Sequence, residues 1–182
     1  YKAPPRTWHP LPETRNPLKD RKYPEPATLF DDYAGRAAPA SKHMMGIDRH
    51  MRMDYDLKYP AEKIAELGRM TAEQRRDFMA AYQEENRAFE ADPPTGKDLV
   101  RWKYQRYLRD YLACVSSIDS NVGRLLDYLK ESGLERDTIV VYSSDQGFYL
   151  GEHGWFDKRW MYEESFRMPL LVRWPAVVKP GI

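Results

Sequence analysis

The sequence contains very little cysteine, since Cys114 is the only one among 182 residues. No internal disulfide can form, so cysteine usage does not indicate a redox compartment. The sequence also lacks an excess of either charge, because its 29 Lys and Arg residues are almost equal in number to its 28 Asp and Glu residues. This balance excludes the positive field that attracts nucleic acid or an anionic membrane, and we expect neither as a partner. No apolar run approaches the roughly 20 residues that a membrane helix needs.

An initiator Met and a charged-then-apolar leader are also missing, because the sequence begins with Tyr1 and Lys2. Either a leader has been removed or the chain is an internal piece of a longer protein. Proline, in contrast, is abundant at the start, where 8 of the 14 prolines lie before residue 41. Prolines this dense prevent a helix of normal length. We therefore expect residues 1–60 to form an irregular proline-rich segment that covers a site.

Two helices are predicted after this segment. Thr71 and Gln74 have the spacing of a capping box, which predicts a helix from there to about residue 90. A longer helix is predicted from about residue 97 to 131. Apolar residues recur there every three or four positions, as they do on the buried face of a helix.

Two strands follow the long helix in the sequence. Residues 138–143 are short, β-branched and apolar, which predicts a central strand buried on both faces. Residues 170–174 predict a second strand that ends at Pro175. A long helix that leads into a buried strand is typical of α/β proteins. We therefore expect residues 61–182 to form an α/β portion with a mainly parallel sheet flanked by helices.

The strand at 138–143 leads directly into Ser144-Asp145-Gln146-Gly147. Ligands of open α/β sheets gather at the carboxyl ends of strands, where Asp145 would lie. Asp145 and Gln146 place one charged and one neutral oxygen side by side, which suits a hard cation such as calcium or magnesium. The alternative is an ordinary turn in which Asp145 bonds to local amides.

The loop at 151–159 combines glycines with His153 and Lys158, and such a loop is costly to order without a function. Lys158 is predicted to reach an anionic substrate held by the metal, unless it is a solvated surface lysine. His153 either donates a hydrogen bond to an oxygen at the site or only ties the loop down.

Three ordered stretches resemble the second signature region of the sulfatases, which belong to the alkaline phosphatase superfamily. They are Thr138-Ile-Val-Val-Tyr-Ser-Ser-Asp-Gln-Gly, then Leu150-Gly-Glu-His-Gly with Lys158 after it, then Tyr162-Glu-Glu-Ser-Phe-Arg-Met-Pro-Leu. The resemblance is densest from about residue 97 to 182, and it is closest to bacterial sulfatases of sulfated sugars. It implies an alkaline phosphatase-like fold that is incomplete here.

The resemblance also implies roles for individual residues. Asp145 and Gln146 would be metal ligands, for calcium or else magnesium. Lys158 would contact the sulfate oxygens, and Lys2 would match a second sulfate-binding lysine. His153 joins these lysines as a candidate catalytic residue. The family often follows the second lysine with Ala-Pro-His, but this sequence has Pro5 at the histidine position.

The catalytic nucleophile of the family, a formylglycine made from cysteine or serine, is not found in this sequence. Its motif requires an arginine four residues after the cysteine, whereas Ile118 holds that position after Cys114. Cys114 is instead predicted to be a packing residue of the long helix. We therefore expect the formylglycine upstream of Tyr1, further family parts downstream of Ile182, and no hydrolysis by this chain alone.

The leading interpretation is a part of a sulfatase that hydrolyses sulfate esters, with a sulfated small molecule or glycan as substrate. Its further partners would be the remaining parts of the sulfatase domain. A phosphate or phosphonate ester hydrolase of the same superfamily is the first alternative, because both substrates are tetrahedral oxyanions. A non-catalytic sulfatase-like module is the second. Bacterial members of the family are usually exported, which predicts a periplasmic or secreted protein.

Overall fold

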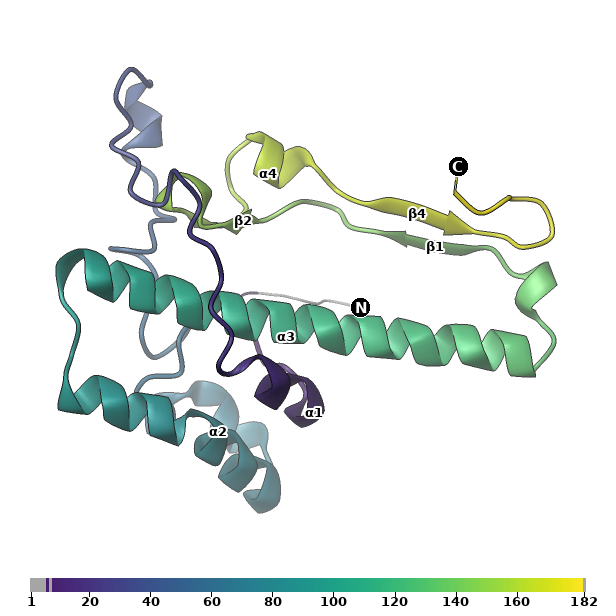
Figure 1. The fold of residues 1–182 in the computed structure, drawn as a ribbon, viewed down its shortest axis with the longest axis horizontal. Helices are drawn as coiled ribbons and strands as arrows, with labels where there is room; N and C mark the ends of the chain where they lie inside the picture. The colour runs from purple at the N-terminus through teal and green to yellow at the C-terminus, as the bar shows by residue number, and fades with distance from the viewer. Residues whose placement is uncertain (1–5, 7, 182) are drawn as a thin grey trace. The chain divides into compact units, whose positions relative to one another are not determined.

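The computed structural model describes residue 6 and residues 8–181 (Figure 1). Its helices are α1 (Pro12–Arg15), α2 (Ala72–Ala91), α3 (Gly96–Glu131) and α4 (Glu163–Phe166). Its strands are β1 (Val140–Ser143), β2 (Tyr149–Leu150), β3 (Phe156–Asp157) and β4 (Leu170–Arg173). Within the described part of the chain, no helix combines the length and the apolar character that crossing a bilayer requires.

The chain divides into two compact units. Unit 1 contains residues 1–117 and 150–157, and unit 2 contains residues 118–149 and 158–182. In unit 1, residues 8–60 hold α1, short 3-10 turns and an isolated β-bridge between Gly46 and Trp155, and they are otherwise irregular, as their prolines predict. The predicted boundary at residue 60 and the prediction that residues 1–60 cover the site stay predictions.

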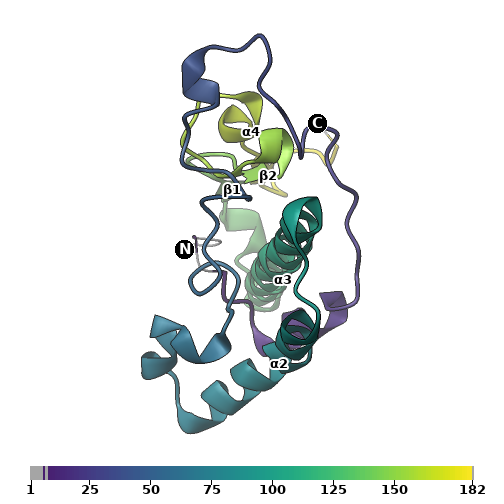
Figure 2. The same ribbon diagram turned by 90° about the vertical axis from the view of Figure 1, so that its left-hand side faces the viewer.

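Both predicted long helices are present, and the start of α2 is the predicted capping box. The Thr71 side chain accepts a hydrogen bond from the Gln74 amide at 3.2 Å, and the Gln74 side chain accepts one from the Thr71 amide at 3.0 Å. Two backbone donors of the first turn are therefore satisfied without water. Figure 2 shows α2 beside the first part of α3.

Charged side chains, rather than an apolar stripe alone, fasten α2 and α3 to the irregular segment of unit 1. The ammonium of Lys58, fully buried, lies 2.8 Å from the Asp110 carboxylate, which also accepts a hydrogen bond from the Tyr82 hydroxyl at 3.0 Å. Arg106, also buried, donates to the carbonyl of Leu57 at 2.6 Å. Buried charges are stable only with such partners, so these contacts specify how the three segments pack.

The expected parallel sheet is wrong for the strands that the structure describes. In unit 2, β1 and β4 pair antiparallel, with Val141 opposite Val172 and Ser143 opposite Leu170. β2 and β3 form a second two-stranded sheet. A parallel pair needs a long crossover, usually a helix. Residues 144–169 instead contain α4, a helix of four residues, as their only α-helix, and the chain folds back along β1 (Figure 1).

The prediction that residues 138–143 are buried on both faces is also wrong here. Val141 is 59% exposed, and Leu170 and Leu171 of the paired strand β4 are 70% and 63% exposed. A two-stranded ribbon leaves both faces open unless other elements cover them. The apolar composition is nevertheless that of an interior strand, because both faces carry large apolar side chains.

Candidate functional site

The turn after β1 is fixed by contacts with α4 and by its own serine. The Ser144 hydroxyl donates to the Gln146 carbonyl at 2.7 Å, and the Gly147 amide donates to the Ser165 carbonyl at 2.7 Å. A Cβ atom on Gly147 would lie 2.0 Å from the Glu164 carbonyl oxygen. Only glycine allows the two backbones to approach this closely. Any other residue at position 147 would push the turn away from α4.

The Asp145 carboxylate is not used by this turn. Asp145 is exposed, Gln146 is half-buried, and the side chains of both make no hydrogen bond or ion pair with another described residue. The alternative of a turn that consumes the aspartate for its own amides therefore finds no support in these contacts. Two adjacent hard oxygens remain open to a ligand.

These donors fit calcium or magnesium in type, because both ions prefer carboxylate and amide oxygens. They do not complete a site, since calcium takes six to eight oxygen ligands. Among the residues that the structure describes, no group of three or more His, Cys, Asp or Glu side chains is placed to hold a metal ion. Any ion at Asp145 and Gln146 would need further ligands from water or from other residues.

Lys158 belongs to the same unit as Asp145 and directly follows β3. Its side chain is exposed and makes no ion pair with another described residue. The preceding residue, Asp157, is buried and has a left-handed backbone with φ 77°. This unusual backbone sets the direction in which the chain leaves β3 toward Lys158. Unit 2 thus contains an open carboxylate and an open ammonium, as a metal and an oxyanion would require.

His153 lies in unit 1, where residues 28–36 surround it. Its Nδ1 atom lies 3.0 Å from Asp31 Oδ2 and 3.0 Å from Arg36 Nη1. The carboxylate only accepts and the guanidinium only donates, so Asp31 favours the neutral tautomer with a proton on Nδ1 and Arg36 favours the other. Burial acts to raise the pKa of Asp31, but hydrogen bonds from Tyr33 and His153, with the charge of Arg36, lower this pKa below its ordinary value.

The loop around His153 is also tied to the irregular segment through its backbone. The Ile47 amide donates to the Gly154 carbonyl and the Phe156 amide donates to the Met45 carbonyl, each at 2.9 Å. A Cβ atom on Gly154 would lie 2.8 Å from the Leu29 carbonyl oxygen. The composition of the loop predicts that it is costly to order, but the residues that hold it lie more than a hundred positions away and carry no local pattern.

Two predicted residues, Lys2 and Pro5, lie outside the described residues. Cys114 is confirmed as a buried residue of α3 with a free thiol. Burial, with the nearby Asp110 charge, raises the pKa of the Cys114 thiol to about 12. A thiol with this pKa is not a nucleophile near neutral pH.

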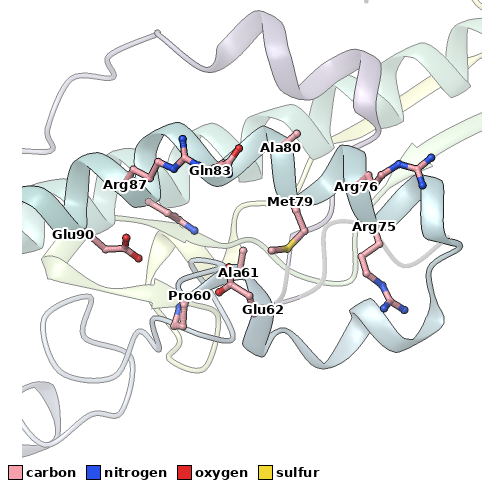
Figure 3. Close-up of a pocket in the computed structure, with 11 residues that line it drawn as sticks. Pro60, Ala61, Glu62, Arg75, Arg76, Met79, Ala80, Gln83, Arg87 and Glu90 are labelled. Carbon is pink, nitrogen blue, oxygen red and sulfur yellow. The ribbon is translucent and has the colours of Figure 1, made fainter.

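A groove of about 570 Å³ lies beside α2 in unit 1 (Figure 3). It contains none of the predicted site residues. Arg75, Arg76 and Arg87 line it, but Figure 3 shows their guanidinium groups directed away from one another. Such an arrangement does not make a shared anion site, which requires donors that converge on one point.

Comparisons with known proteins bear on this arrangement. The sequence model of a protein family described as Sulfatase matches residues 19–181. The N-acetylglucosamine-6-O-sulfatase of Bacteroides thetaiotaomicron is 44% identical over 190 aligned positions, which cover 99% of this chain and 34% of that protein. A sulfatase of Formosa agariphila is 40% identical over 87 positions, which cover 48% of this chain and 17% of that protein.

The solved structure of BT4656 in complex with its substrate, D-glucosamine-2-N,6-O-disulfate, superimposes on this chain with a TM-score of 0.91. The sequence identity is 44%, and the match covers 98% of this chain and 38% of that chain. The fold described above is therefore the fold of the corresponding part of BT4656. The chain spans about a third of the length of the N-acetylglucosamine-6-O-sulfatase and of the BT4656 chain.

Proposed function

This chain belongs to the sulfatase family, and we propose that it forms the metal- and sulfate-binding part of an enzyme that hydrolyses sulfate esters of carbohydrates. The observation that carries the proposal is the open Asp145 carboxylate, placed by β1 and α4 in the same unit as Lys158, which makes no ion pair with another described residue. A divalent ion and a sulfate group are the ligands that such a pair of opposite charges suits.

The proposed substrate is a glucosamine that carries a 6-O-sulfate. The relative from Bacteroides thetaiotaomicron is named for this sulfate position, and BT4656 was solved with a 6-O-sulfated glucosamine as its substrate. Identity of 44% along 99% of the chain supports the transfer of a substrate class between the two proteins.

Each predicted residue has a role in this proposal. Asp145 and Gln146 hold the cation, whose charge would neutralise the sulfate group when bound. Lys158, with Lys2, donates hydrogen bonds to the sulfate oxygens and stabilises the negative charge that develops on them. His153 donates a hydrogen bond to an oxygen of the bound substrate. Calcium is the proposed ion, with magnesium as the alternative.

The nucleophile of the proposed enzyme, a formylglycine, lies outside these 182 residues. Cys114 cannot replace it, because its thiol is buried in α3 and has a pKa of about 12. We accordingly propose that the isolated chain does not hydrolyse sulfate esters. Incubation of the chain with an aryl sulfate and calcium checks this, and turnover above that of a Cys114→Ala variant would contradict it.

Remaining parts of a sulfatase domain are the proposed partners of this chain. The exposed apolar side chains on both faces of the β1 and β4 ribbon support this proposal, because they match strands that other elements cover in the interior of a domain. The proposed enzyme acts in the periplasm or outside the cell.

A chimera tests the proposed function. This chain replaces the matching third of the N-acetylglucosamine-6-O-sulfatase of Bacteroides thetaiotaomicron, and hydrolysis of a 6-O-sulfated glucosamine is measured with calcium. We expect activity in the chimera and a loss of at least about a hundredfold in its Lys158→Ala variant. A folded chimera that cleaves only a phosphate ester, or neither ester, would contradict the proposal.

A further inference from the structure

The backbone of His153 has a conformation that is uncommon for residues other than glycine. Its φ and ψ are 58° and 19°, in the left-handed region. Crowding of the Cβ atom against the following carbonyl disfavours this region for every residue except glycine. A residue stays in such a conformation only when its surroundings impose it, and such residues gather at functional sites.

Hydrogen bonds on both sides of the His153 Cα atom hold this conformation. Its amide donates to the Thr28 hydroxyl at 3.0 Å, and its carbonyl accepts a hydrogen bond from the Tyr33 hydroxyl at 2.7 Å. Asp31 connects the backbone contact to the ring. One of its oxygens accepts from the Tyr33 amide at 2.9 Å, and the other lies 3.0 Å from the His153 ring.

The hydroxyl of Tyr33 can donate only one hydrogen bond, either to His43 Nε2 or to the His153 carbonyl. The positions of the neighbouring protons decide between these two acceptors. The Met45 amide donates to His43 Nδ1 at 3.0 Å, so a neutral His43 carries its proton on Nε2, which lies 3.1 Å from the Tyr33 hydroxyl. Trp155 Nε1 donates to the same hydroxyl at 2.8 Å. Because its oxygen already accepts two hydrogen bonds, the Tyr33 hydroxyl donates its own hydrogen bond to the His153 carbonyl.

Burial supports this arrangement, because it raises the pKa of Tyr33 above its ordinary value and keeps the hydroxyl protonated. The ring of Tyr33 is held independently of the hydroxyl, since it stacks on Trp155 with centroids 5.8 Å apart. The hydroxyl is therefore a separable element of the structure, which a phenylalanine would remove without removing the ring contact.

We propose that Tyr33 is a positioning residue, whose hydroxyl holds the strained backbone of His153 and thereby sets the direction of its imidazole toward a bound substrate. The role in catalysis rests on the proposed function, in which His153 touches the substrate. The geometry favours this positioning role over a purely structural role, in which the contacts only anchor the loop. Anchoring alone would not require the ring, the amide and the carbonyl of one strained residue to be fixed together.

The test compares Tyr33→Phe with Tyr104→Phe. Tyr104 is a matched control in the same unit, since its hydroxyl also donates to a backbone carbonyl at 2.7 Å, that of Pro24. In the 182-residue chain, amide hydrogen exchange of His153 is followed by NMR. We expect Tyr33→Phe to speed this exchange about fivefold to tenfold, as the loss of one hydrogen bond predicts, and Tyr104→Phe to leave it unchanged.

The chimera gives the catalytic readout. We expect Tyr33→Phe to lower kcat about tenfold with KM within about twofold, because a misdirected imidazole affects the transition state more than substrate binding. Unchanged His153 exchange, or unchanged kcat in an active chimera, would overturn the positioning role alone. An inactive chimera without either substitution would instead overturn the proposed function, and with it the catalytic role of Tyr33.

Discussion

Among single residues, His9 is predicted to make stability depend on pH. Burial, and then the charge of Lys58, lowers the pKa of His9 to about 4. An unfolded histidine has a pKa of about 6.5, so the unfolded chain gains a proton first as the pH falls. The contribution of neutral His9 is fully present above about pH 6.5 and is lost as the pH falls toward 4.

Urea unfolding at pH 7 and at pH 4.5 measures this effect. The chain should lose about 2 kcal/mol more of its free energy of unfolding between these two pH values than a His9→Asn variant does. Equal losses in the two proteins would show that His9 titrates normally in the folded chain.

Gly147 gives a second prediction, for the turn that carries Asp145. Substitution to alanine would place Cβ 2.0 Å from the Glu164 carbonyl oxygen, so the two backbones must separate. We expect Gly147→Ala to lower the free energy of unfolding by about 1–3 kcal/mol.

Gly123→Ala is the control, because Gly123 lies in α3 in the same unit with no atom within 4 Å of the added Cβ. It should raise stability by about 0.5–1 kcal/mol, since alanine favours a helix. Destabilisation of similar size by both substitutions would show that the close approach of Gly147 to α4 is not what matters.

For whole elements, the cap of α2 offers the clearest prediction. Thr71→Ala removes the oxygen that accepts from the Gln74 amide. We expect a loss of about 1 kcal/mol in the free energy of unfolding of unit 1, measured by circular dichroism during urea unfolding. Thr71→Ser keeps the acceptor and should retain most of the stability, so equal losses in the two variants would contradict a capping role.

The helices could be predicted because their signals are local. The capping residues of α2 and the three-to-four-residue spacing in α3 lie within the elements that they specify. The segments of β1 and β4 were also predicted, but their pairing was not, and the short strands β2 and β3 were not predicted. Whether β1 pairs parallel or antiparallel depends on residues 144–169 and on β4, and apolar strand composition alone does not report it.

The contacts of the candidate site could be predicted only in part for the same reason, and the roles of its residues stay predictions. Asp145, Gln146 and Lys158 follow strands and loop signals that are visible in the sequence. Tyr33 and Thr28 could not be found, because their contacts with His153 join positions 120 and 125 residues apart. Contacts at such separations are set by tertiary packing, for which a single sequence gives no periodic signal.

On the scale of the whole molecule, two facts belong together. The chain matches BT4656 over 98% of its own length but over only 38% of that protein. Its β1 and β4 ribbon exposes large apolar side chains on both faces. We therefore predict a module that carries some of the groups that bind the ion and the substrate, with the rest of both binding sites supplied by further parts of a sulfatase.

A calcium titration of the isolated chain, followed residue by residue by NMR, tests whether Asp145 is a metal ligand. We expect weak binding, with a Kd in the millimolar range, and chemical-shift changes centred on the amides of Asp145 and Gln146. In an Asp145→Asn variant these shifts should disappear. Shifts that are absent from the turn, or that persist unchanged in the variant, would contradict the assignment of Asp145 as a metal ligand.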